Sequence, residues 1–64
     1  MDKVKVNIEQ FLALNVLRRR YSYGDDIIVL AIHDLGWIDK ETLALNSLSR
    51  DELLRALHHG YSFA

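Results

Sequence analysis

The 64-residue sequence contains no cysteine, no proline and only three glycines. Without cysteine the chain can form neither a disulfide framework nor a thiolate metal site. A chain this short buries only about 60% of the surface that its unfolded state exposes, so a single core gives a small margin of stability. Two ways of stabilising the fold remain, namely tight packing of helices and association with another chain.

The sequence also lacks an excess of charge and a long apolar run. Eight Lys and Arg against nine Asp and Glu give a net charge of −1, whereas proteins that bind nucleic acid or anionic membranes are usually basic. No apolar run approaches the roughly 20 residues of a membrane span, and the N-terminus lacks the apolar segment of a secretory signal. We therefore expect a cytoplasmic protein that does not associate with membranes.

Apolar residues, in contrast, make up 50% of the sequence, which is too many for a disordered chain. Six of them are consecutive, from Ile27 to Ile32. At 100° per residue, six residues in a row cover every direction around a helix, and a helix that is apolar on all sides belongs in an interior. We therefore predict a central helix over residues 25–35, ended by Gly36, in which Ala31 and Ile32 are buried.

Side chains typical of helix N-caps precede three further segments. The strongest signals are two capping boxes, in which the cap and a Gln or Glu three residues later accept from each other's backbone N–H groups. These boxes are Asn7 with Gln10 and Ser49 with Glu52. With Asp39 as a third cap, the predicted helices cover residues 8–20, 50–59 and, in a short segment, 40–46.

The two ends of the chain lie outside these helices. Residues 3–8 alternate between polar and apolar as in a strand, but no antiparallel partner lies nearby in the sequence. We predict a single all-α domain over residues 1–64, a compact bundle of three to four short helices around the central apolar helix. Residues 1–7 form an extended lead-in, which pairs at most in an oligomer, and residues 61–64 an aromatic tail.

An α+β fold is the alternative, with residues 27–32 as a buried strand beside residues 4–8. Periodicity does not separate a helix from a strand for so short an apolar run. We favour the helix because a two-stranded parallel sheet has too few strands to cover its faces.

One candidate site combines arginines with aromatic residues. Arg18, Arg19 and Arg20 are followed by Tyr21 and Tyr23, a pattern that can bind phosphates and stack on bases. The same arginines also suit a helix C-terminus, where they compensate the macrodipole.

A helix-turn-helix over residues 28–45 fits poorly. Ile32 stands where the first helix needs a small residue, and Asp39 and Glu41 stand where the second helix would meet phosphates.

Catalytic and metal-binding patterns are weak. His58 and His59 point about 100° apart on a helix, so together with His33 they make a poor metal site. Helix positions explain Asp25 and Asp26, which favour a helix N-terminus. No nucleophile with a base and no glycine-rich phosphate loop is recognisable. We therefore predict no enzymatic activity, no cofactor and no metal.

The remaining signal is an excess of large apolar residues, including Val29, over what so small an interior holds. Aromatic residues near arginine are common anchors of protein interfaces. We predict a small non-enzymatic regulator or adaptor that binds a protein, in particular itself as a homodimer. The predicted contact residues are Arg18, Arg19, Arg20, Tyr21, Tyr23, Trp37, Tyr61 and Phe63. The alternative is a small nucleic-acid-binding regulator that uses residues 18–23.

Overall fold

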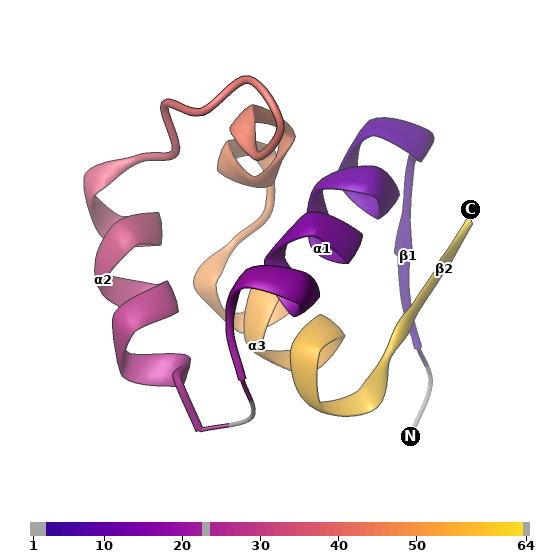
Figure 1. Cartoon of the computed structure of the whole chain (residues 1–64). Helices are drawn as coiled ribbons and strands as arrows, with labels where there is room; N and C mark the ends of the chain where they lie inside the picture. Colours follow the sequence, from indigo (N-terminus) through magenta and orange to yellow (C-terminus); the bar gives the residue numbers. More distant parts are fainter. Residues whose placement is uncertain (1–2, 23, 64) are drawn as a thin grey trace.

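The computed structural model describes residues 3–22 and 24–63. Three α-helices, a short 3₁₀ helix and two short strands follow one another along the chain (Figure 1). Their bounds are β1 Val4–Val6, α1 Ile8–Arg20, α2 Asp26–Leu35, η1 Leu43–Ser47, α3 Arg50–His59 and β2 Tyr61–Phe63. The prediction of a mostly helical chain is confirmed. Within the described part of the chain, no helix has the length and apolar content needed to cross a membrane.

Helix ends agree well with the local signals of the sequence. Both predicted capping boxes are present, one at Asn7 before α1 and one at Ser49 before α3. Residues 27–32 are helical and not a strand, and Gly36 ends α2 with a φ of 102°. In the segment predicted as a short helix over residues 40–46, residues 40–42 form turns and the 3₁₀ helix η1 covers Leu43–Ser47 instead.

The two ends of the chain pair as a parallel two-stranded sheet. Val4 lies opposite Tyr61 and Val6 opposite Phe63. The alternating pattern of the lead-in thus indicated a strand correctly, but its partner is the aromatic tail of the same chain. Such a small sheet is stable here because α1 covers it, with the ring of Phe11 stacked 4.4 Å from that of Phe63. The expectation that the lead-in has no partner within the chain was wrong.

Helix α1 is the centre of the fold. In Figure 1 it lies between α2 on the left and the sheet on the right, and it contacts η1, β2 and α3. Its buried residues, Ala13, Leu14 and Leu17, form the core together with side chains from every neighbouring element, among them Leu45 of η1 and Leu53 of α3.

The predicted central position of α2 was wrong. Val29 is the one residue of α2 that is buried, whereas Ala31 is exposed and Ile32 is half-buried. The helix contacts mainly α3, so one side of it faces the protein and the other faces solvent. Its apolar character on all sides therefore did not place it in the interior.

Candidate functional site

The most exposed apolar surface of the described residues lies on α2. Ile27 is 82% exposed and Leu35 88%, and Ile38, just after the helix, is 93% exposed. We use the name α2 outer face for this surface, which consists of Ile27, Ile28, Ala31, Leu35 and Ile38. Large, contiguous apolar surfaces are uncommon on monomeric proteins and mark sites of interaction.

The helical repeat explains why the side chains of Ile27, Ala31 and Leu35 share one side of α2. Residues four apart advance by only about 40° around the helix, so Ile27, Ala31 and Leu35 form one stripe. Val29 lies about 200° from Ile27 and is 2% exposed. The side opposite the stripe is thus the side that packs against α3.

The end of α2 is fixed by polar contacts. Asn46 accepts a hydrogen bond from the backbone N of Trp37 at 2.7 Å and donates one to the backbone O of Trp37 at 2.8 Å. The Trp37 indole Nε1 donates to His33 Nδ1 at 2.9 Å. With Nδ1 as acceptor, the neutral ring carries its proton on Nε2, which donates to the Leu48 carbonyl at 2.8 Å.

These contacts account for one predicted contact residue. Trp37 is 5% exposed, so it is part of the core and not a surface anchor. Its burial keeps the chain after α2 close to η1, while Ile38, the next residue, remains outside.

The three arginines at the end of α1 are exposed, but they do not form one cationic site. Arg20 pairs with Asp39 at 2.5 Å and with Glu41 at 3.2 Å. The hydrogen bond to Asp39 raises the pKa of Arg20. The guanidinium of Arg18 lies 6.0 Å from the ring centroid of Tyr61.

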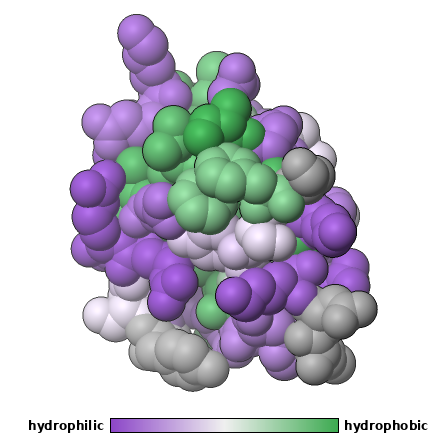
Figure 2. All heavy atoms as spheres, turned by 90° about the vertical axis from the view of Figure 1, so that its right-hand side faces the viewer, coloured by the Kyte–Doolittle hydropathy of each residue, from purple (hydrophilic) through white to green (hydrophobic). Residues whose placement is uncertain are grey.

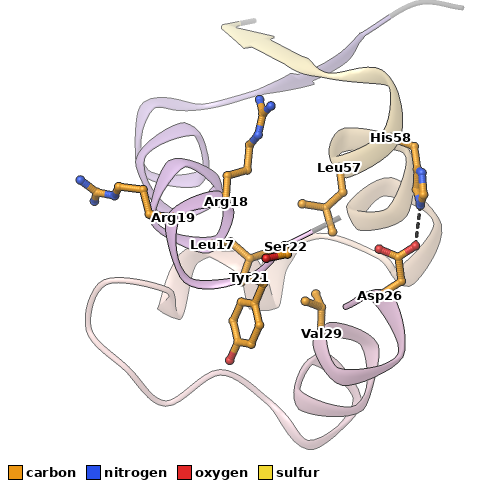
Figure 3. A pocket seen from close by; sticks show the side chains of 9 residues that line it. All are labelled: Leu17, Arg18, Arg19, Tyr21, Ser22, Asp26, Val29, Leu57 and His58. Carbon is orange, nitrogen blue, oxygen red and sulfur yellow. Dashed lines mark hydrogen bonds and ion pairs between the residues drawn. The ribbon is translucent and has the colours of Figure 1, made fainter. Parts of the chain in front are cut away.

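A pocket of about 420 Å³ lies beside Arg18 and Arg19, where the end of α1 meets α2 and α3. Figure 3 shows that Leu57 and Val29 point toward its middle and that Arg19 points away from it. His58 Nε2 and Asp26 Oδ2 are 2.7 Å apart at one side. A carboxylate at the pocket and an arginine turned outward make it a poor receptor for phosphate.

The predicted aromatic contact residues have varied positions. Tyr21 is half-buried against the core. Tyr61 is also half-buried, and its hydroxyl donates to Asn15 Oδ1 at 2.5 Å. Phe63 is 52% exposed although it stacks on Phe11, and Tyr23 lies outside the described residues. The structure therefore does not bring the predicted contact residues together on one surface.

A second apolar patch lies on the strand side of the molecule. Figure 2 shows it as a hydrophobic area bordered by hydrophilic residues. Of the exposed large apolar residues of α1 and β2, Ile8, Leu12 and Phe63 are each 52% to 55% exposed. These side chains are less exposed than Ile27, Leu35 and Ile38, and Phe11 of the same chain already covers part of the Phe63 ring.

Sequence reasoning missed the α2 outer face although its signal was present. The run Ile27 to Ile32 was correctly identified as apolar on all sides, but it was assigned to the interior. The helix with more neighbouring elements is α1, which contacts η1, β2 and α3, whereas α2 mainly contacts α3.

No protein-family model, no curated protein and no solved structure matches the chain. Within residues 3–22 and 24–63, no group of three or more His, Cys, Asp or Glu side chains is placed to hold a metal ion. A functional proposal therefore depends on the surface of the molecule.

Proposed function

We propose that the protein is a small non-enzymatic regulator or adaptor that acts by binding protein, and that it self-associates through the α2 outer face. The observation that supports this proposal is the exposure of 82%, 88% and 93% for Ile27, Leu35 and Ile38. A helix that is apolar on all sides but buried on only one side exposes apolar side chains to water. Covering them with another surface is energetically favourable.

The free energy available from burying this face is of the same order as the cost of association. Full burial of an Ile or Leu side chain contributes about 1.5–3 kcal/mol. Scaled by their exposed fractions of 82%, 52%, 88% and 93%, the four large residues Ile27, Ile28, Leu35 and Ile38 thus contribute roughly 5–9 kcal/mol per copy, or roughly 9–19 kcal/mol when two copies pair. Association costs about 4–15 kcal/mol in lost freedom of motion, so the two ranges overlap.

The alternative function is nucleic-acid binding by residues 18–23. The exposure of Arg18 and Arg19 at the end of α1 supports it. Against it stand the pairing of Arg20 with two carboxylates and the net charge of −1. We therefore prefer the protein-binding function.

Light scattering after size exclusion tests the proposal. At micromolar concentration we expect about twice the 7.4 kDa chain mass, little changed by added salt because the contact is apolar. Leu35→Glu is expected to give the monomer. Leu12→Glu is the matched control, since Leu12 is also an exposed helical leucine, at 55%, and this variant is expected to remain dimeric.

Two results would contradict the proposal. If Leu12→Glu dissociates the dimer and Leu35→Glu does not, the contact lies at Leu12 of α1 and not on the α2 outer face. A monomeric protein that binds oligonucleotides with a steep salt dependence, and loses that binding in Arg18→Ala and Arg19→Ala, would favour the alternative, because counterion release makes phosphate binding sensitive to salt.

A further inference from the structure

The two ends of the α2 outer face differ in shape. Ile27 and Ile28 are exposed at the N-terminal end of α2, at 82% and 52%. A hollow of about 450 Å³ lies at the C-terminal end, lined on the α2 side by Ile32, Leu35 and Gly36. The face thus has protruding isoleucines at one end and, at the other, a hollow whose α2 side is apolar and whose opposite side includes the ion pair of Arg20 and Asp39.

The protruding end and the hollow lie on the same side of the helix. At 100° per residue, Ile28, Ile32 and Leu35 fall within about 60° of one another. Ala31 lies midway between them, with Ile27 four residues before it and Leu35 four residues after it. A face with this symmetry can pair with itself when the second helix runs in the opposite direction.

On this basis, and resting on the proposed self-association, we infer that two copies pair through antiparallel α2 helices with the two-fold axis at Ala31. In a two-fold contact, residue i of one copy meets residue j of the other, and j meets i. Ile27 of each copy then packs against Leu35 of the other, and Ile28 of each copy fills the hollow of the other.

The charge on this face favours the antiparallel direction. Asp34 lies about 20° from the direction of Ile27 around the helix, and its carboxylate pairs with Arg50 at 3.2 Å. In an antiparallel pair, the two Asp34 residues lie about 9 Å apart along the helix axis. In a parallel pair they lie at the same position along the axis, so the two carboxylates are closer together. The parallel arrangement would also place Ile27 against Ile27 and leave the hollows empty.

The small side chain at the axis permits close packing. Packed helices lie about 8–10 Å apart, and the Cα atoms of each lie about 2.3 Å from its axis. The Cα atoms of two facing Ala31 residues are therefore expected about 4–5 Å apart. Two copies of Ile27 would instead be displaced by about 12 Å along the axis.

Disulfide cross-linking tests this geometry, because a disulfide needs Cα atoms within about 7 Å. The sequence has no cysteine, so each introduced cysteine is unique. Ala31→Cys is expected to give a linked dimer on mild oxidation. Ile27→Cys and Leu35→Cys are each expected to link poorly with themselves but readily when the two variants are mixed. Leu12→Cys, at an exposed position of α1, is the control for links formed by random collision.

Other patterns of cross-links would overturn the inference. Efficient self-linking of both Ile27→Cys and Leu35→Cys, without preference for the mixture, would show parallel helices. A dimer by light scattering in which Ala31→Cys links no faster than Leu12→Cys would place the contact elsewhere and leave the proposed self-association intact. A monomer at high concentration would contradict both. Circular dichroism of each variant verifies that it remains folded, which is expected because Ala31, Ile27 and Leu35 are exposed.

Discussion

Helices α1 and α2 show that apolar content and burial are separate properties in this small domain. Helix α2 contains the longest apolar run of the chain, yet Val29 is its one buried residue. Helix α1 carries three arginines and two polar amides, yet Ala13, Leu14 and Leu17 are completely enclosed. The difference lies in the neighbours, because α1 contacts η1, β2 and α3, whereas α2 mainly contacts α3.

The comparison also bears on the proposed binding surface. The buried apolar side chains of α1, namely Ala13, Leu14 and Leu17, are used within the chain, so their role is stability, whereas Ile8 and Leu12 of the same helix are exposed. The apolar side chains on the outer side of α2 have no such role in the single chain, and we propose that a second copy covers them. Substitutions on the two helices are therefore expected to affect different measurements.

The largest expected effect is a contrast between two leucines. Leu14 of α1 is completely buried and Leu35 of α2 is 88% exposed. Leu14→Ala is expected to cost about 2–5 kcal/mol through the lost burial and the cavity, in a domain whose total stability is about 5 kcal/mol. Leu35→Ala is expected to change stability by less than about 0.5 kcal/mol under dilute, monomeric conditions.

Thermal unfolding monitored by circular dichroism measures both variants. Leu14→Ala should lower the melting temperature by more than about 10 °C or leave the chain unfolded. Equal effects of the two substitutions at low protein concentration would show that α2 is as enclosed as α1. That result would contradict the difference in burial between Leu14 of α1 and Leu35 of α2.

The next effect concerns how α2 is held at its end. Asn46 makes two hydrogen bonds to the backbone of the buried Trp37. Asn46→Ala leaves that backbone N–H and carbonyl without partners and is expected to cost about 1–3 kcal/mol. Urea unfolding, followed by the emission of Trp37, the single tryptophan of the sequence, measures the loss.

Asn46→Asp is the matched variant for this contact. It keeps the acceptor for the Trp37 N–H but loses the donor to the Trp37 carbonyl, so an intermediate loss is expected. An Asn46→Ala variant as stable as the parent would mean that apolar packing alone holds this end of α2.

A smaller effect is expected at the helix caps, which distinguish α2 from its neighbours. Ser49 Oγ accepts from the backbone N–H of Glu52 at 3.1 Å, whereas the N-cap of α2, Asp25, makes no such bond. Ser49→Ala is expected to destabilise the domain by about 1 kcal/mol in urea unfolding. Ser49→Asp keeps an acceptor and should recover most of the loss. No loss in Ser49→Ala would mean that tertiary packing, and not the cap, fixes the start of α3.

The smallest effect is a pH dependence that separates the two capping boxes. The backbone N–H of Ser49 donates to Glu52 Oε1 at 2.9 Å and lowers the pKa of Glu52. The box before α1 uses the neutral Gln10 in the same position. Because the folded-state pKa is the lower one, the contribution of Glu52 is complete above its ordinary value of 4.5 and is lost as the pH falls through the lowered value.

Melting temperatures between pH 6 and pH 3 measure this dependence. The parent is expected to lose more stability over this range than Glu52→Gln, which turns the α3 box into the uncharged kind found before α1. The other carboxylates are common to both proteins, so the difference isolates Glu52. Parallel pH profiles would contradict the assignment.

Local features of the fold could be predicted from the sequence because they involve residues three or four apart. The capping boxes at Asn7 and Ser49 defined the starts of α1 and α3, and Gly36 defined the end of α2. For the candidate site, the sequence indicated an excess of apolar side chains but not which residues expose them. The excess was assigned to Trp37 and the tyrosines and not to Ile27, Leu35 and Ile38.

The sequence by itself determined the helical segments and their ends, since a cap or a positive φ at glycine depends on neighbouring residues. Only the tertiary structure decided that Val4 pairs with Tyr61, because this contact joins opposite ends of the chain. The tertiary structure also decided which helix contributes the most buried side chains. Burial depends on how many elements pack against a helix, and in this chain η1, β2 and α3 contact α1 and enclose Ala13, Leu14 and Leu17, whereas α2 mainly contacts α3 and buries Val29 alone.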